Sequence, residues 1–181
     1  MAYTLVDTPI GPLRVVVEKA AIVAIEFWPD PSVPRDMIGQ LPASADRARR
    51  RSEGRATGPR QDDHPVLVNA RTQLTEYFAG ERTRFDLPLA PVGSDFQQRV
   101  WSLLLEISYG EVATYGELAG RLGKGPGAAR AVGLANGSNP IPIVIPCHRV
   151  VGADRSLTGY AGGINRKRAL LDLEASDHTL F

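Results

Sequence analysis

Cysteine is almost absent from this sequence, because Cys147 is the single thiol in 181 residues. One cysteine cannot form an intramolecular disulfide, and it excludes zinc fingers and other cysteine-rich metal sites. Long apolar runs are missing too, since no stretch approaches the roughly 18 residues of a membrane span. The N-terminal residues have no basic region before an apolar core, as a secretory signal would require. We therefore expect a cytoplasmic protein that does not enter a membrane.

The composition that remains is typical of a folded protein. Hydrophobic residues make up 43% of the chain and charged residues 23%, which excludes wholesale disorder and fits one large or two small domains. The net charge of +1 is unevenly distributed, since residues 121–168 hold eight Lys and Arg against one acidic residue, a local +7. The other residues therefore sum to −6. This asymmetry suggests an anionic partner, although a solvated basic face is the ordinary alternative.

Residues 1–87 are predicted to form a small α/β domain. Short turns separate three β-branched runs, which are typical of an antiparallel meander: residues 3–6, 13–18 and 21–27. Residues 29–63 follow without hydrophobic periodicity, rich in proline and with six arginines between Arg47 and Arg60. We therefore predict a flexible insertion at 29–63.

A helix is expected to complete this domain. It begins at Pro65, where Asp63 or His64 can act as the cap, and it stops before Gly80. Residues 88–93 contain two prolines, and we predict that they link the first domain to a second one at 94–181.

The second domain is predicted to be mostly helical. Capping-box patterns start two of its helices, at Ser94 with Gln97 and at Thr114 with Glu117. Apolar spacing predicts helices at residues 94–110, 115–122, 128–136 and 164–173. A glycine-bearing turn joins the helices at 115–122 and 128–136, which is the pattern of a helix-turn-helix. An ordinary pair of antiparallel helices fits these residues equally well.

The most informative stretch is Ile141–Val151. Within it we expect Ile143–Ile145 to be a short buried strand. Pro146 prevents the strand from continuing, so Cys147 should emerge at a sharp bend beside the core.

The surroundings of Cys147 favour chemistry, although a lone cysteine is often only a small inert hydrophobic residue. His148 is adjacent, Arg149 adds positive potential and prolines flank the segment, as a thiolate-generating site requires. A third group must orient the imidazole, and Glu174, following the apolar stripe of residues 164–173, is a candidate. The alternative is an exposed helical glutamate without such a role.

Several ordered motifs then resemble one known family. They are Phe-Gln-Gln-Arg-Val-Trp at 96–101, Tyr-Gly-Glu-Val at 109–112, Tyr115, Arg-Ala-Val-Gly at 130–133, Asn-Pro at 139–140, Pro-Cys-His-Arg-Val at 146–150, Gly-Tyr-Ala-Gly-Gly at 159–163, Leu-Leu at 170–171 and Glu174. With these motifs, residues 95–174 are similar to the O6-alkylguanine-DNA alkyltransferases, or methylated-DNA–protein-cysteine methyltransferases. The N-terminal third matches only in its strand pattern.

The resemblance implies an α/β fold class: a small ribonuclease-H-like α/β N-terminal domain and a mostly helical C-terminal domain with the helix-turn-helix. It implies DNA repair by irreversible transfer of the alkyl group from O6-alkylguanine, and less efficiently O4-alkylthymine, to Cys147, so that each molecule acts once. His148 would remove the thiol proton through a bound water, and Glu174 would orient the imidazole. Tyr115 would donate a proton or hydrogen bond to a ring nitrogen of the leaving guanine.

The implied partner is double-stranded DNA containing O6-alkylguanine, bound through the minor groove. The damaged nucleotide would be flipped out, and Arg130 would occupy the vacated space in the stack. Small neighbours would let the helix enter the groove: Ala129, Ala131 and Gly133. The resemblance assigns five residues to the substrate pocket and its frame: Asn139, Pro142, Val150, Tyr160 and Ala161.

Ala161 stands where some relatives have serine, which removes a hydroxyl but keeps the backbone N–H. The zinc ligands of some relatives are absent here, so we expect no metal. We also expect no cofactor, and we expect a monomer. One alternative is an alkyltransferase-like protein that binds the lesion without repairing it, but there the acceptor cysteine is replaced. A cysteine hydrolase of the acyl-transfer type is another, but it explains neither the helix-turn-helix nor the basic segment.

Overall fold

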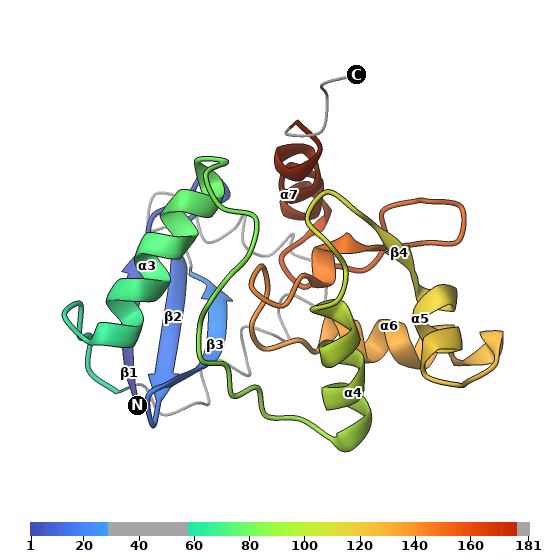
Figure 1. The fold of residues 1–181 in the computed structure, drawn as a ribbon, viewed down its shortest axis with the longest axis horizontal. Coiled ribbons are helices and arrows are strands. Elements are labelled where there is room, and N and C mark those ends of the chain that lie inside the picture. Colours follow the sequence, from blue (N-terminus) through green and yellow to red (C-terminus); the bar gives the residue numbers. More distant parts are fainter. Residues whose placement is uncertain (29–57, 177–181) are drawn as a thin grey trace, which may run out of the picture. The chain divides into compact units, whose positions relative to one another are not determined.

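The structure is a computed structural model that describes residues 1–28 and 58–176 (Figure 1). It divides into two compact units, Met1–Pro91 and Val92–Phe181. No helix in the described ranges is long and apolar enough to cross a membrane.

The first unit contains the predicted antiparallel meander. Its strands are β1 (Ala2–Val6), β2 (Leu13–Glu18) and β3 (Ala21–Phe27), hydrogen-bonded in that order. Lys19 and Ala20 close the β2–β3 hairpin, both with positive φ, as the favoured two-residue hairpin turns require. This part of the prediction is confirmed.

Helix α3 (Pro65–Phe78) lies along this sheet and closes the core of the first unit (Figure 1). One face of α3 is buried through Leu67, Ala70, Leu74 and Tyr77. His64 holds the N-cap position, but its side chain makes no capping hydrogen bond. The predicted side-chain cap is therefore wrong, and Pro65 in the first turn leaves one fewer N–H to be satisfied.

Residues 58–63, the end of the predicted insertion, form an irregular segment with one isolated bridge to β1, from Arg60 to Tyr3. The Tyr3 N–H donates to the Pro59 carbonyl at 3.2 Å, and the Gln61 N–H donates to the Tyr3 carbonyl at 2.9 Å. These bonds pair the segment with β1 and fix Arg60, which forms an ion pair with Asp62. The rest of the predicted insertion, with its other six arginines, lies outside the described residues.

Part of the predicted linker also pairs with the first unit. The Ile22 N–H donates to the Pro88 carbonyl at 2.7 Å, and the Ala90 N–H donates to the Ile22 carbonyl at 2.8 Å. A proline carbonyl remains a full acceptor although its nitrogen is not a donor, so Pro88 suits an edge position beside β3.

The second unit is mostly helical, as predicted. Its elements are α4 (Asp95–Leu104), β4 (Ala113–Thr114), α5 (Tyr115–Arg121), the 3-10 turn η1 (Pro126–Ala128), α6 (Ala129–Gly137), the 3-10 turn η2 (Cys147–Arg149), β5 (Val150–Val151) and α7 (Ile164–Ser176). Both predicted capping boxes are present, at the starts of α4 and α5. Helix α4 ends at Leu104, earlier than predicted, and turns continue to Gly110, whose φ is +77°.

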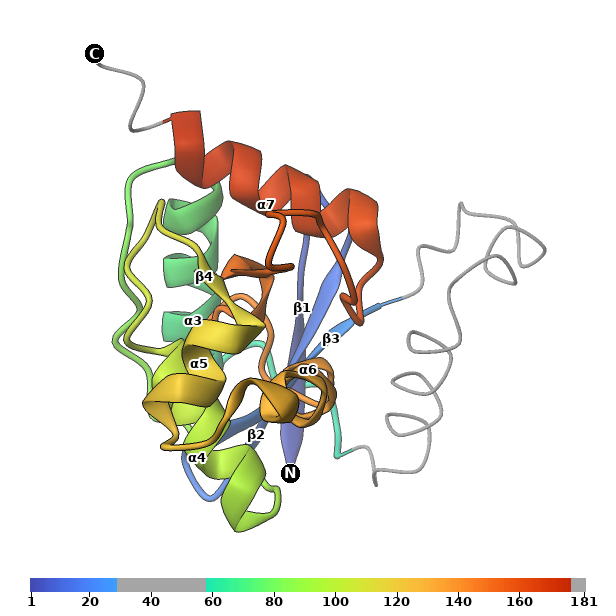
Figure 2. The same cartoon turned by 90° about the vertical axis from the view of Figure 1, so that its right-hand side faces the viewer.

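Helices α5 and α6 form the predicted helix-turn-helix and lie together in both views (Figures 1 and 2). Leu118 and Ala119 of α5 and Val132 and Ala135 of α6 are buried. Helix α4 packs against α6, where the Trp101 indole N–H donates to the Ala135 carbonyl at 2.9 Å. This buried bond sets the position of α6 in the unit.

The strand predicted at Ile143–Ile145 is wrong. This segment is a tight turn closed by a hydrogen bond from the Ile145 N–H to the Ile141 carbonyl at 2.9 Å, and Ile143 has a φ of +75°. The apolar residues are buried as expected, but the chain reverses where a strand would extend. Cys147 follows on η2, and β5 then pairs in parallel with β4.

Candidate active site

Two asparagines hold the turn that carries Cys147. The Asn139 side-chain amide donates to the Ile145 carbonyl at 2.8 Å, and its oxygen accepts from the Ile141 N–H at 3.0 Å. Asn136 of α6 donates through Nδ2 to the Cys147 carbonyl at 3.2 Å. Cys147 itself is buried, with 4% of its surface exposed. The thiol therefore sits on a fixed backbone against the core.

His148, next in the chain, reaches across to Glu174 of α7. Its Nε2 lies 2.8 Å from Glu174 Oε1, and both side chains are buried. Arg149 makes a forked contact with the same carboxylate, from Nε to Oε2 at 2.8 Å and from Nη2 to Oε1 at 2.9 Å. The Gly110 N–H donates to Oε2 at 3.2 Å. Glu174 is therefore not the exposed helical glutamate of the alternative interpretation.

These contacts determine the protonation states of His148 and Glu174. Burial disfavours the carboxylate of Glu174, but hydrogen bonds from His148 and Arg149 outweigh burial and lower its pKa to about 2. Burial lowers the pKa of His148, which is therefore neutral near pH 7, although Glu174 opposes the shift. An ionised carboxylate can only accept, so Nε2 carries the hydrogen. Nδ1 is left as a buried acceptor with no partner, and it can receive a proton.

The electrostatics of Cys147 differ from the prediction. Burial raises the pKa of the thiol to about 11, although hydrogen bonds from the Asn139 side chain and the backbone lower it. Arg149 does not supply the expected positive potential, because its guanidinium binds Glu174 and donates to the Ile107 carbonyl at 2.6 Å. The free protein thus holds a thiol, and deprotonation must accompany the reaction.

The cation that acts on Cys147 is Lys167 of α7, and its charge lowers the thiol pKa. Its side chain is fully buried, with Nζ donating to the Val150 carbonyl at 2.5 Å and to the Thr158 carbonyl at 2.8 Å. Burial lowers the pKa of Lys167 to about 8. Sequence analysis missed this residue.

Tyr115, the first residue of α5, faces the same region. Its hydroxyl donates to the Thr158 carbonyl at 3.2 Å, and the carbonyl is thus shared with Lys167. Burial raises the pKa of Tyr115, and a negative charge on Cys147 after loss of the thiol proton raises it further. Tyr160 is buried, and its pKa lies well above the ordinary value of 10.0 because of burial and, again, Cys147. Both phenols are therefore neutral groups beside the thiol.

The remaining predicted site residues fall into two sets. Pro142 and Val150 are buried in the frame of the turn and in β5, whereas Ala161 is half-buried in the turn before α7. On α6, Arg130 and Ala131 are exposed and Ala129 is half-buried. Gly133 is half-buried on α6. It lies against the Tyr115 ring, where an added Cβ would make ordinary contact at 3.7 Å.

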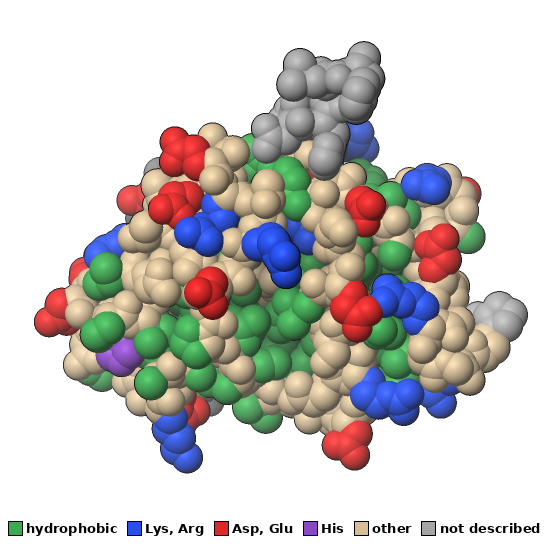
Figure 3. Space-filling model, in the orientation of Figure 1, with side chains coloured by type: hydrophobic (Ala, Val, Ile, Leu, Met, Phe, Trp, Pro, Cys, Tyr) green, Lys and Arg blue, Asp and Glu red, His purple; other side chains and the backbone are tan. Residues whose placement is uncertain are grey.

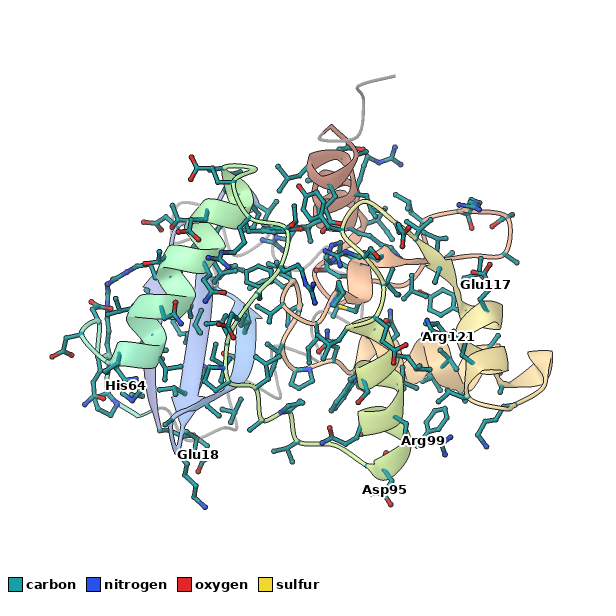
Figure 4. All side chains as sticks on the ribbon, in the orientation of Figure 1. Glu18, His64, Asp95, Arg99, Glu117 and Arg121 are labelled. Atoms are coloured by element: carbon teal, nitrogen blue, oxygen red, sulfur yellow. The ribbon has the colours of Figure 1, made fainter. Side chains whose placement is uncertain are left out.

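Basic side chains do not form a uniform patch on the face drawn in Figure 3, where acidic and basic groups alternate over the second unit. Glu117 and Arg121 of α5 are both exposed (Figure 4), and Arg121 forms an ion pair with Glu106. Two of the eight cations of residues 121–168, Arg149 and Lys167, are buried. The local charge of +7 is therefore partly an internal feature.

The structure thus brings Cys147, His148, Glu174, Tyr115, Tyr160 and Asn139 into one region of the second unit. Lys167 and Asn136 belong with them and were not predicted. A signal for Lys167 exists in the spacing, since Lys167, Leu170 and Glu174 share one face of α7 at helical intervals and all are buried. Among residues 1–28 and 58–176, no His, Cys, Asp and Glu side chains are grouped as metal ligands.

Fold and site together define a class: a two-unit α/β protein whose helix-turn-helix unit holds one buried cysteine beside a His–Glu pair. Residues 1–91 match the 6-O-methylguanine DNA methyltransferase, ribonuclease-like domain. Residues 95–176 match the 6-O-methylguanine DNA methyltransferase, DNA binding domain. The chain belongs to the 6-O-methylguanine DNA methyltransferase family, and the predicted fold class is confirmed.

Relatives cover most of the chain. A methylated-DNA–protein-cysteine methyltransferase of Mycobacterium tuberculosis is 62% identical over 123 residues, which are 66% of this chain and 74% of that protein. The protein of the same name in Mycobacterium leprae is 44% identical over 168 residues, 93% of this chain and 88% of the relative. A crystal structure of Mycobacterium tuberculosis OGT in complex with DNA is 45% identical, with a TM-score of 0.78, covering 97% of this chain and 94% of that one.

Proposed function

We propose that this protein repairs DNA by transferring the alkyl group of O6-alkylguanine to its own Cys147, and less efficiently that of O4-alkylthymine. The observation that carries the proposal is the single cysteine of the chain, buried beside the His148–Glu174 pair in the DNA-binding unit. The names of the relatives, methylated-DNA–protein-cysteine methyltransferases, support the same reaction.

The reaction is a displacement at the alkyl carbon. A bond forms between Cys147 Sγ and this carbon while the bond from the carbon to O6 breaks, and the electron pair stays on guanine. The thiol proton passes to His148 Nδ1, through a water molecule, and Glu174 stabilises the resulting imidazolium. Tyr115 gives a proton to a ring nitrogen, so guanine leaves as a neutral base. A thioether does not revert, so each molecule acts once.

The neutral thiol and the neutral imidazole suit a proton transfer that occurs during the displacement. The pKa of Cys147 lies near 11 and that of His148 is below its ordinary value, so the free protein does not store the ion pair. Lys167 lowers the cost of the developing thiolate, since its ammonium charge lowers the pKa of the thiol.

For DNA we propose a minor-groove contact by a monomer through α6. The alkylated carbon is inaccessible inside a stacked duplex, so the nucleotide must be flipped out. Arg130 is exposed on α6 beside the small exposed residue Ala131, and so its long side chain is free to replace the flipped base in the stack. Tyr160 and the backbone N–H of Ala161 would then line the pocket for the base.

The test is the mass of the intact chain after incubation with an excess of duplex DNA containing O6-methylguanine. We expect the chain to gain one methyl group and the repaired guanine to accumulate to one equivalent of protein. Cys147→Ser should gain nothing and should still bind the duplex within a few fold of the wild type, since other residues hold the lesion. Repeated turnover by the wild type would contradict an irreversible acceptor. An unchanged mass would contradict the acceptor role of Cys147 and would fit a lesion-binding protein or a cysteine hydrolase.

A further inference from the structure

The exposed face of α6 carries one large apolar side chain, that of Leu134. This residue is 68% exposed. Because successive residues of an α-helix are about 100° apart, Leu134 projects between Arg130 and Ala131, which are also exposed. Gly137, the remaining exposed residue of α6, lies on the same side, one turn beyond Leu134. Leu134 is therefore at the centre of the surface that α6 presents to solvent.

This face of α6 has few polar groups. Arg130 is its one polar side chain, and the other exposed residues are leucine, alanine and glycine. The neighbouring helices differ, because their exposed positions include residues of both charges: Asp95 and Arg99 of α4, and Glu117 and Arg121 of α5 (Figure 4). A single exposed leucine is ordinary on a protein surface, but a helix face with one cation and otherwise apolar or small residues indicates a bound partner.

The composition of this face fits the minor groove of DNA. Helix α6 lies within residues 95–176, which match a DNA binding domain. A helix that binds phosphates presents several lysines and arginines, whereas α6 presents Arg130 alone. Minor-groove proteins instead place aliphatic side chains, leucine among them, against or between the bases. Since α6 contains no acidic residue, nothing on this helix repels a polyanion.

We propose that Leu134 is an apolar DNA contact, which packs against the sugars and base edges of the minor groove beside the position where Arg130 enters the stack. The inference rests on the proposed binding of α6 in the minor groove. Leu134 follows Arg130 by about 6 Å along the helix axis, which is less than two base steps of about 3.4 Å each. Both side chains therefore act within the same few base pairs, and Leu134 adds affinity that does not depend on salt.

The experiment measures dissociation constants and second-order repair rates with duplex and single-stranded DNA containing O6-methylguanine. The minor groove exists only in the duplex. Leu134→Ala should therefore bind the duplex about tenfold more weakly and repair it about tenfold more slowly, as expected when part of a leucine side chain is no longer buried. Its salt slope should stay that of the wild type, because no charge is removed. Binding of the single strand and reaction with free O6-benzylguanine should change by less than about twofold.

The matched control is Leu105, at the end of α4, which is an exposed leucine of the same unit with an exposed fraction of 53%. Leu105→Ala should leave duplex binding within about twofold of the wild type. Leu134→Lys then distinguishes the groove wall from the phosphates. Against an apolar wall the lysine should weaken duplex binding at about 0.2 M salt, because its ammonium group loses water. At a phosphate it should tighten binding and steepen the salt slope by about one.

Duplex binding by Leu134→Ala equal to that of the wild type would overturn the contact and leave this face of α6 to a protein partner or to water. Tighter binding by Leu134→Lys would overturn it too and place the residue at the phosphates. Equal losses on duplex, single strand and free base would make Leu134 a structural residue. A wild type that gains no methyl group, or that does not bind the duplex, would instead refute the proposed function. The two failures therefore give different results.

Discussion

Lys167 places a full positive charge in the interior beside the thiol. Its ammonium group is held by the carbonyls of Val150 and Thr158, and its charge lowers the pKa of Cys147. Lys167→Met should therefore raise the thiol pKa and slow alkylation of Cys147 by iodoacetamide near pH 7, below the Lys167 pKa of about 8, by about tenfold for each unit of thiol pKa. The rate is followed by the mass of the intact chain.

Arg168→Met is the control, because Arg168 is the exposed neighbour and carries the same charge. It should leave the rate within about twofold, as an exposed and screened charge does. If the positive charge is the cause, Lys167→Arg should be alkylated faster than Lys167→Met. If Lys167→Met is alkylated at the same rate as the wild type, Lys167 acts only through its hydrogen bonds to the Val150 and Thr158 carbonyls.

At the scale of single residues, the sequence predicts the reacting groups better than their surroundings. Cys147 and His148 stand out because a lone thiol beside an imidazole is unusual in a chain, and Glu174 follows the apolar stripe of its helix. The pairing of Arg149 with Glu174 depends on how α7 packs on η2, which no local pattern encodes. Lys167 sits in an Arg-Lys-Arg run that resembles a solvated surface, and only its register on α7 indicates burial.

At the scale of elements, sequence patterns that span a few residues predict the structure well. Structure that depends on contacts with more distant residues is not predicted. Both capping boxes form because their partners are three residues apart, and the meander follows from β-branched runs separated by short turns. The segment Ile143–Ile145 has the composition of a strand, but its backbone is set by Asn139, which bonds to both sides of the turn. Strand propensity does not take into account the hydrogen bonds from the Asn139 side chain, which favour the turn over an extended strand.

Helix α6 presents Arg130 to solvent, and the base flipping that we propose for Arg130 belongs to this element. An intercalating side chain offsets the cost of unstacking, whereas a phosphate contact contributes to the salt dependence of binding. Arg130→Ala should therefore slow repair of O6-methylguanine in duplex DNA by about 10- to 100-fold, the equivalent of a few kcal/mol of unstacking. Repair of free O6-benzylguanine should change by less than about twofold.

The control is Arg121→Ala, which removes the same charge from exposed α5. Arg121→Ala should change the repair rates of duplex DNA and of free O6-benzylguanine by the same factor. A weakly pairing base opposite the lesion lowers the cost of extrusion and should partly rescue Arg130→Ala. If Arg130→Ala loses equal activity on both substrates, Arg130 shapes the pocket or the fold and does not flip the base.

At the scale of the whole molecule, the two units have separate cores, and the buried ionisable pair belongs to the second one alone. Each unit also has its own tryptophan, Trp28 in the first and Trp101 in the second. Trp28→Phe leaves Trp101 to report on the second unit, and Trp101→Phe leaves Trp28 to report on the first. The stability of each unit can therefore be followed separately as pH is changed.

His148 and Glu174 both bind protons less readily in the folded second unit than in the unfolded chain. The pKa of His148 is lowered from 6.5 by burial, and that of Glu174 falls from 4.5 to about 2 through its hydrogen bonds from His148 and Arg149. A lowered pKa gives stability that is complete above the unfolded value and is lost as pH falls toward the folded value. The second unit should therefore lose stability from pH 6.5 downward, and further below 4.5.

Urea unfolding of the two single-tryptophan proteins between pH 8 and pH 3 tests this expectation. The Trp101 midpoint should fall with acid before the Trp28 midpoint does, because the pKa of His148 is lowered from 6.5, whereas that of Asp62, an exposed carboxyl of the first unit, is lowered from 3.8. His148→Gln with Glu174→Gln should lower the Trp101 midpoint at pH 8 and flatten its dependence on pH above 4.5. Parallel pH profiles for both tryptophans would show that this pair does not control the acid stability of the second unit.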